Sequence, residues 1–189
     1  MPVPSDPPAD TAELIALMGT GAKVRFLHFW KHDTDPAAPA GRGSLSQWAP
    51  IGFTVDGVRY DTAEHWMMWS KAVLFGDTVT AGRILEARHP GDVKKLGREV
   101  RGFDETVWKR ERFGIVVAGS EAKFGQRDDL REYLIGTGDQ ILVEASPLDR
   151  IWGIGLSAQD ASADEPALWR GLNLLGFALM RARTTLAGS

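Results

Sequence analysis

The chain has 189 residues, no cysteine and seven tryptophans, and its 22 basic and 25 acidic side chains give a net charge of −3. This length is typical of a single domain. The absence of cysteine excludes disulfides, thiolate nucleophiles, cysteine-ligated zinc and iron–sulfur clusters in this chain. The small net charge argues against broad, nonspecific binding to a polyanion, because such binding needs a strongly basic surface.

No export or membrane signal is apparent. Residues 1–17 contain three acidic side chains and no basic one, whereas a signal peptide starts with basic residues and continues with an apolar run. The apolar run at residues 171–180 is far shorter than the ~20 residues that span a bilayer. We therefore predict a cytoplasmic protein without a membrane partner, and the sequence indicates no protein partner.

The first third of the chain predicts a tail, a strand, a loop and a hairpin. Residues 2–10 contain four prolines, and residues 1–22 are predicted to form a mobile N-terminal tail and lead-in. The apolar run at 24–30 predicts a buried strand, and the Pro-, Ala- and Gly-rich stretch at 33–44 predicts a loop. Asp56-Gly57, between two short apolar runs, predicts a tight hairpin turn.

Helix signals dominate the remainder. Asp61-Thr62-Ala63-Glu64 resembles a capping box, which predicts a helix from there to about Phe75. Further predicted elements are helices at 78–88, 104–124 and 128–135, a strand at 140–144, a loop at 146–155, and a last helix from about Glu165 with Pro166 in its first turn. The fold class that follows is α+β: a single, mostly helical domain over residues 23–189 with a small β-sheet.

Two of these helices carry a predicted core stripe. In the last helix the stripe is formed by leucines at +4, +3 and +4 spacing, namely Leu168, Leu172, Leu175 and Leu179. In helix 104–124 the predicted buried face carries Trp108, Ile115 and Ala122, while Gly114 and Gly119 weaken the helix prediction.

The helix after Tyr60 carries the most informative side chains. At 100° per residue, Glu64, Met68 and Lys71 share one narrow face, and tryptophans occupy the opposite face. Burying a carboxylate or an ammonium group is costly unless the charge is paired or used in function. The alternative, which spacing alone favours, is that Glu64 closes the capping box with Asp61 and Lys71 extends to solvent.

Other candidate sites are weaker. His28 and His32 are four residues apart but fall in a predicted strand and loop, and no His-Glu-x-x-His pattern occurs, so we predict no metal site and no cofactor. Gly153 and Gly155 would allow a backbone to approach a phosphate, although they match neither the P-loop nor the dinucleotide pattern, and ordinary turn formation stays open. For Asp149 the residues alone indicate a turn or an ion pair with its neighbour.

Eight segments resemble, in order, the NADAR superfamily, the group of the YbiA-like N-glycosidases that is named for its association with NAD and ADP-ribose. The resemblance covers roughly residues 24–186. The matching segments are LSQWAP at 45–50, AEHWM at 63–67, LGR at 96–98, AKFGQ at 122–126, TGD at 137–139, VEASP at 143–147, DRIWGIG at 149–155, and NLLGFALM at 173–180 with Arg183.

This resemblance implies an α+β fold and a metal-free hydrolase that cleaves the N-glycosidic bond at C1 of a phosphorylated ribose. Two substrate classes are associated with the family: ribosylamino-pyrimidine phosphates of the early riboflavin pathway, and ADP-ribose attached to guanine in DNA. Glu64, Trp108 and Asp149 match active-site positions of the family, and Lys71 matches the lysine that follows its Glu-His motif. Gln47 departs from the asparagine of many members, which bears on substrate preference.

The resemblance also suggests a role for each residue. Glu64 would stabilise positive charge at C1, and Lys71 would either attack C1 as a covalent nucleophile or only bind phosphate while water attacks. Asp149 would bind ribose hydroxyls or orient Lys71. The remaining predicted contacts are base stacking by Trp108 or Trp152, phosphate binding by Arg98, Gly153 and Gly155, and substrate contacts by Gln47 and His65.

Two alternatives stay open. The chain is predicted to take a phosphoribosyl or ADP-ribosyl substrate, but a non-catalytic ADP-ribose-binding module would keep the same residues. The many basic side chains between residues 83 and 112 would suit an ADP-ribosylated DNA substrate. Acidic side chains are interspersed among them, so solvated helix faces are the preferred interpretation of this stretch.

Overall fold

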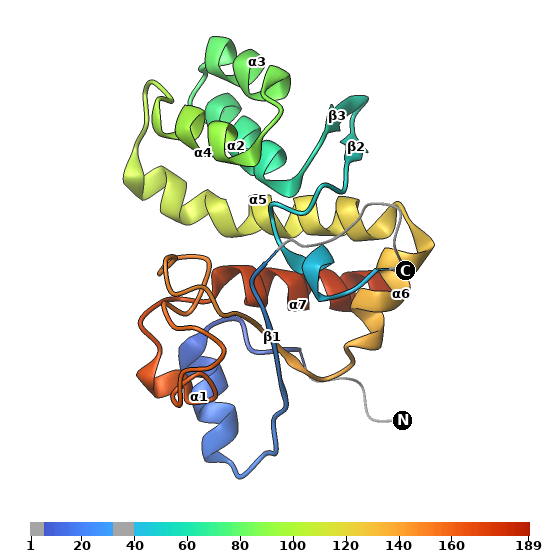
Figure 1. The fold of residues 1–189 in the computed structure, drawn as a ribbon, viewed down its shortest axis with the longest axis vertical. Coiled ribbons are helices and arrows are strands. Elements are labelled where there is room, and N and C mark those ends of the chain that lie inside the picture. The colour runs from blue at the N-terminus through green and yellow to red at the C-terminus, as the bar shows by residue number, and fades with distance from the viewer. Residues whose placement is uncertain (1–5, 32–39) are drawn as a thin grey trace. The chain divides into compact units, whose positions relative to one another are not determined.

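The computed structural model describes residues 6–31 and 40–189, which form two compact units (Figure 1). Unit 1 contains residues up to 31 and from 131 onward, and unit 2 contains residues 32–130. The described residues are mostly helical with two small two-stranded sheets, so the predicted α+β class is confirmed. The predictions for residues 1–5 and 32–39, in the tail and the 33–44 loop, lie outside the described residues.

Unit 1 is built on a parallel strand pair. β1 (Phe26–Phe29) pairs with β4 (Ile141–Glu144), which confirms both predicted strands, and α7 (Leu174–Ala187) packs against β4. α1 (Thr11–Gly19) contacts the short 3-10 helix η2 (Pro166–Leu168) and buries Leu14 completely. No helix is predicted from the sequence at 11–19, which falls in the segment assigned to the N-terminal lead-in.

The last helix begins later than the leucine spacing predicts. η2 covers a single turn, and α7 starts at Leu174, directly after Asn173 in the left-handed conformation (φ 52°). The Asn173 amide donates to the carbonyl of Leu142 at 2.9 Å and accepts from the amide of Glu144 at 3.0 Å. Leu168 and Leu172 are 52% and 47% exposed, so the predicted core stripe is wrong for these two residues. The leucine spacing extends over residues 169–173, where the chain is not helical.

Unit 2 holds an antiparallel hairpin and a group of helices. β2 (Phe53–Val55) and β3 (Val58–Tyr60) pair through a turn in which Asp56 and Gly57 have positive φ, which confirms the predicted hairpin. After the 3-10 helix η1 (Arg42–Leu45) and this hairpin, the helices are α2 (Ala63–Leu74), α3 (Thr78–Glu86), α4 (Pro90–Arg98) and α5 (Glu105–Gly125), and α6 (Asp128–Gly136) crosses the boundary to unit 1. α2 packs against α3, α4 and α5.

The starts of two helices in unit 2 differ from what the sequence indicates. The N-cap of α2 is Thr62, whose hydroxyl accepts from the amide of His65, so Asp61 does not close a capping box with Glu64. The sequence pattern is compatible with either Asp61 or Thr62 as the N-cap, and the position of the preceding hairpin decides for Thr62. No helix is predicted from the sequence at 90–98, yet Pro90 is the first residue of α4, where its missing N–H costs nothing.

The buried face of α5 is rotated from the predicted one. Trp108, Ile115 and Ala122 are only partly buried, whereas the face that is covered carries Arg112, Val116, Gly119, Ser120, Lys123 and Phe124. The indole of Trp66 in α2 lies against Gly119 and donates to the carbonyl of Ile115 at 2.7 Å. The residues at seven-residue spacing therefore lie at one edge of the buried face of α5, and this face includes two charged residues, Arg112 and Lys123.

Gly119→Ala is expected to destabilise the protein by about 1–3 kcal/mol, because the added methyl group would collide with the Trp66 ring. Gly114→Ala, in the same helix, is the matched control: nothing lies within 4 Å of its Cβ position, and replacing a helical glycine there is expected to stabilise by up to about 1 kcal/mol. Urea unfolding of both variants measures the difference. Equal effects of the two substitutions would contradict this account of the α2–α5 contact.

Lys123 is the most deeply buried cation in the described residues. Its ammonium group donates to the carbonyls of Ser44 at 2.6 Å and Ser46 at 2.9 Å, and it lies 5.2 Å from the ring of Phe124. Burial lowers its pKa from 10.5 to about 7, because removing water disfavours the charged form. The side chain thus fastens residues 44–46 to α5.

The shifted pKa of Lys123 predicts a pH-dependent stability. Between about pH 7 and 10.5 the unfolded chain keeps a proton that the folded chain releases, so the free energy of unfolding rises with pH in this range, by at most about 1.4 kcal/mol per pH unit. Urea unfolding between pH 7 and 9 is expected to show a shallower rise for Lys123→Met than for the wild type. Lys95→Met, at an exposed site, is expected to leave the slope unchanged; parallel curves for all three proteins would refute the assignment.

Candidate active site

Glu64 lies in the first turn of α2 and is only 3% exposed. Its amide donates to the carbonyl of Gln47 at 3.0 Å, so the loop after η1 holds the start of the helix at this residue. The positive end of the helix dipole favours the ionised form of a carboxylate at this position. The structure therefore places a buried carboxylate where a negative charge is stabilised without exposure to water.

Gln47 lies next to Glu64 and is itself 8% exposed. Among the described residues, its side-chain amide nitrogen has no hydrogen-bond partner. A buried donor without an acceptor costs free energy, which a ligand that accepts from it would recover. Burial and an unused donor agree with the predicted substrate contact, which stays a prediction.

His65 has both ring nitrogens engaged. Nδ1 is 2.8 Å from the Thr62 hydroxyl, and Nε2 is 2.8 Å from the carbonyl of Ala87. A carbonyl only accepts, so Nε2 carries the proton and Nδ1 accepts from the hydroxyl. His65 thus ties the start of α2 to the end of α3, and this structural role leaves no ring nitrogen for the substrate contact that the sequence predicts.

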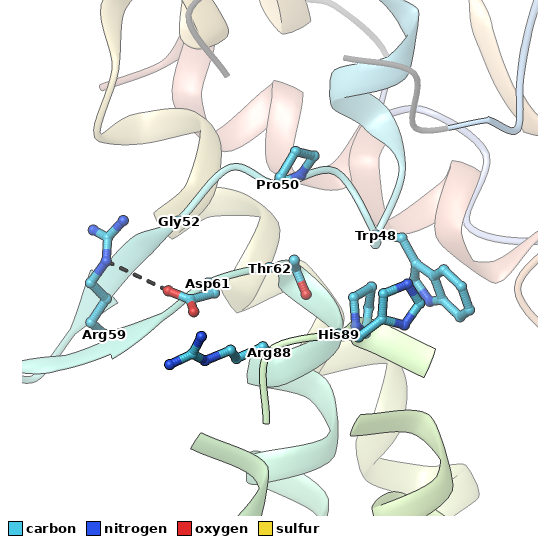
Figure 2. A pocket seen from close by; sticks show the side chains of 9 residues that line it. Trp48, Pro50, Gly52, Arg59, Asp61, Thr62, Arg88 and His89 are labelled. Atoms are coloured by element: carbon cyan, nitrogen blue, oxygen red, sulfur yellow. Dashed lines mark ion pairs between the residues drawn. The ribbon is translucent and has the colours of Figure 1, made fainter. Parts of the chain in front are cut away.

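A pocket of about 430 Å³ lies at the N-terminal end of α2 (Figure 2). Its lining comes from three segments: Trp48, Pro50 and Gly52; Arg59, Asp61 and Thr62; and Arg88, His89 and Pro90. Trp48 follows Gln47 in the chain, and Thr62 precedes Glu64 by two residues. The sequence predicts none of these nine as site residues, although Trp48 and Pro50 belong to the LSQWAP segment, because only the fold brings the three segments together.

Lys71 lies seven residues after Glu64, roughly 10 Å further along the helix axis. Its ammonium group donates to the carbonyl of Gly97 at 2.7 Å and lies 4.3 Å from the ring centroid of Phe103 and 5.5 Å from that of Trp108. Partial burial lowers its pKa. Lys71 therefore turns toward α4 and aromatic rings rather than to solvent, and its ammonium group lies near Trp108, while a shared role of the two in a site stays a prediction.

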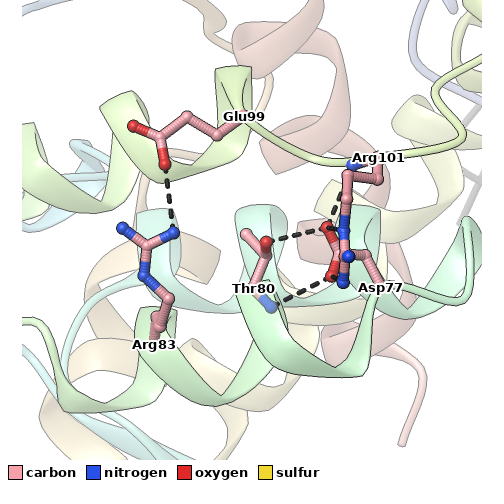
Figure 3. A network of polar contacts seen from close by, with 5 residues as sticks. All are labelled: Asp77, Thr80, Arg83, Glu99 and Arg101. Atoms are coloured by element: carbon pink, nitrogen blue, oxygen red, sulfur yellow. Dashed lines mark hydrogen bonds and ion pairs between the residues drawn. The ribbon is translucent and has the colours of Figure 1, made fainter.

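A network of polar contacts centred on Asp77 lies close in the chain to the residues around Lys71 (Figure 3). Asp77, the N-cap of α3, accepts from the amide and hydroxyl of Thr80 and from the backbone and guanidinium of Arg101. These donors hold the pKa of the Asp77 carboxyl well below its usual range. Because Arg101 precedes Phe103 by two residues, this network fixes the segment that covers Lys71.

Arg98, the predicted phosphate contact, is exposed at the end of α4.

Unit 1 contains the other predicted site residues in one turn. The Asp149 carboxylate accepts from the amides of Ile151 and Trp152, each at 2.8 Å, and its carbonyl accepts from the amide of Gly155 at 3.1 Å. Gly155 has a positive φ of 68°, and a Cβ at Gly153 would collide with the carbonyl of Glu144. Both glycines are thus required by the turn itself. That these residues share a site with Glu64 stays a prediction.

Two buried cations of α5 are not among the site residues predicted from the sequence. Arg112 and Lys123 both lie on the covered face of α5. Lys123 belongs to the AKFGQ segment at 122–126, which is a signal that could have found it, whereas Arg112 lies outside all eight segments. In residues 6–31 and 40–189, no three histidine, aspartate or glutamate side chains gather to form a metal site.

Comparison with known proteins finds relatives over most of the chain. A model of the NADAR domain matches residues 28–187. The chain is 44% identical over 149 residues to "N-glycosidase R617" of Acanthamoeba polyphaga mimivirus, covering 76% of this chain and 88% of that protein. It is 27% identical over 159 residues to "Riboflavin biosynthesis protein PYRR, chloroplastic" of Zea mays, covering 78% of this chain and 24% of that protein.

The fold also has a counterpart among solved structures. The NMR structure of the Escherichia coli protein YbiA matches with a TM-score of 0.66 at 24% identity, covering 88% of this chain and 87% of that one. No helix in the described part of the chain is long and apolar enough to cross a membrane. With the family model spanning most of its length and a relative at 44% identity, the chain belongs to the NADAR domain family.

Proposed function

We propose that this protein is a metal-independent N-glycosidase that cleaves the bond between C1 of a phosphorylated ribose and a nitrogenous base. The observation that carries the proposal is the placement of a buried carboxylate, Glu64, and a half-buried amine, Lys71, on one helix. The name N-glycosidase of the mimivirus relative supports the same chemistry.

Glu64 supplies the electrostatic part of the reaction. As the C–N bond breaks, its electron pair leaves with the base and positive charge develops at C1 and the ring oxygen. A carboxylate already desolvated by the fold stabilises this charge more strongly than one in water would. The base takes up one proton on leaving, and one water molecule is consumed over the whole reaction.

Lys71 provides the nucleophile in the covalent version of the mechanism. Its lowered pKa increases the fraction of neutral amine, which attacks C1 as the base departs. Opening of the ribose ring then gives a Schiff base between the lysine nitrogen and C1, and water hydrolyses it to release the sugar. In the alternative, water attacks C1 directly and Lys71 binds only phosphate.

Two substrates are consistent with this site: ADP-ribose linked to guanine in DNA, and a ribosylamino-pyrimidine phosphate. The name of the maize relative supports the second. In either case we assign base stacking to Trp108 and Trp152, phosphate contacts to Arg98 and the Gly153–Gly155 turn, and sugar contacts to Gln47 and Asp149. Incubation with each substrate, followed by separation of the released base, tests the activity and distinguishes the substrates; ADP-ribose binding without base release would indicate a binding module instead.

Glu64→Gln is expected to lower the turnover of the preferred substrate by about 10²–10⁴-fold, since it removes the charge and keeps the shape. Far-ultraviolet circular dichroism and thermal melting check that the variant is folded. Glu99→Gln is the matched control, because this carboxylate is exposed and pairs with Arg83 away from Glu64. Retained turnover in a folded Glu64→Gln protein would remove Glu64 from the mechanism.

Borohydride reduction during turnover is expected to trap the sugar on Lys71, visible by mass spectrometry of the digested protein. Lys71→Arg should abolish the adduct, because a guanidinium group keeps the positive charge but is not nucleophilic at neutral pH. Lys123 is an internal control, since it also has a lowered pKa but is buried and bonded to two carbonyls. Turnover without any adduct, together with an active Lys71→Arg variant, would favour direct attack by water.

A further inference from the structure

The pocket at the N-terminal end of α2 carries an excess of positive charge. Arg59, Arg88 and His89 line it together with a single carboxylate, Asp61. The Arg59 Nε and Asp61 Oδ1 atoms are 3.8 Å apart, and within the described residues the structure shows no ion pair for Arg88. Figure 2 draws the Asp61 carboxylate between the two guanidinium groups. One carboxylate balances one of the two arginines, so a positive charge is left for a ligand.

Of the donors of the pocket, His89 is held in place. The Arg59 guanidinium lies over Gly52, and its side chain is 66% exposed. His89 Nδ1 accepts from the amide of Gly91 at 3.0 Å, which leaves the ring proton on Nε2 and makes that nitrogen a donor. The Trp48 ring meets His89 edge to face, with centroids 6.0 Å apart, and adds a flat apolar wall.

Two helices begin at this pocket, α2 after Thr62 and α4 after His89. Their positive dipole ends add to the field of the arginines. The first-turn amides of Glu64 and Gly91 are already bonded, to Gln47 and to His89. A ligand would therefore be held by side chains rather than by a nest of backbone amides.

We propose that this pocket binds a phosphate group, with the guanidinium groups of Arg59 and Arg88 and Nε2 of His89 as donors. Arginine suits a phosphate because its planar fork forms two parallel hydrogen bonds with two phosphate oxygens. A volume of about 430 Å³ exceeds one phosphate and leaves room for the sugar or base that carries it, beside Trp48. The carrier is a sugar phosphate or a DNA phosphodiester, and this identification alone rests on the proposed function.

The pocket is next to the candidate active site in the chain. Trp48 directly follows Gln47, and Thr62 lies two residues before Glu64. A substrate cleaved at Glu64 would thus place a second group at the N-terminal end of α2, opposite to the direction of Lys71. This gives the enzyme a contact with its substrate that does not take part in bond cleavage.

Nuclear magnetic resonance titration of the ¹⁵N-labelled protein tests the proposal directly. The probes are inorganic phosphate, ribose 5-phosphate and a short single-stranded oligothymidylate. We expect saturable shifts of the Trp48 indole signal and of the backbone amides of Arg88, His89 and Gly91, and Arg88→Gln should weaken binding about tenfold. Arg83→Gln is the matched control: it removes the same charge from an exposed arginine of unit 2 that pairs with Glu99, and should leave the affinity unchanged.

The absence of saturable shifts at these signals, or equal weakening by Arg83→Gln and Arg88→Gln, would overturn the proposal. Saturation by ribose 5-phosphate alone assigns a sugar phosphate, and tighter, salt-sensitive binding of the oligonucleotide assigns DNA. Binding is measured without turnover, so the two proposals fail separately. A protein that binds phosphate but cleaves neither substrate refutes the function alone, and one that cleaves a substrate while Arg88→Gln binds phosphate normally refutes the pocket alone.

Discussion

The organisation of unit 2 around Glu64 depends on the ammonium group of Lys123. It is buried and donates to the carbonyls of Ser44 and Ser46, so the end of the short helix η1 is fastened to the long helix α5. The next residue, Gln47, accepts from the amide of Glu64. One desolvated cation therefore connects α5, through the end of η1 and Gln47, to the first turn of the helix that carries the candidate catalytic carboxylate.

Burying the Lys123 ammonium group costs free energy that an apolar side chain at the same position would not cost. A methionine could fill the same space, whereas the lysine must lose its hydration, which is what lowers its pKa. Its two hydrogen bonds satisfy two carbonyls that would otherwise be buried without a donor. The cost is consistent with a loop whose position matters more than its stability, because Gln47 and Trp48 on that loop face the candidate site and the pocket.

The sequence was most informative where the signal is local. The Asp56-Gly57 turn, the strand at 140–144 and the helix that carries Glu64 and Lys71 needed only propensity and spacing. The sequence was misleading where the leucine spacing extends past the start of α7 at Asn173. The left-handed conformation of Asn173 depends on hydrogen bonds to β4, some 30 residues earlier in the chain. The pocket was invisible for the same reason, since Arg59 and Arg88 are brought together only by the packing of α2 with its neighbours.

Two glycines explain how α2 carries both an apolar surface and two charged groups. Gly119 of α5 receives the Trp66 ring, and Gly97 of α4 receives the side chain of Met68. The missing side chains let both neighbouring helices approach α2 closely, and the carbonyl of Gly97 thereby reaches the Lys71 ammonium. The closeness that excludes water from the helix also lowers the pKa of Lys71. The close packing around Lys71 and its lowered pKa therefore have the same cause, and a larger residue at position 97 would disturb both.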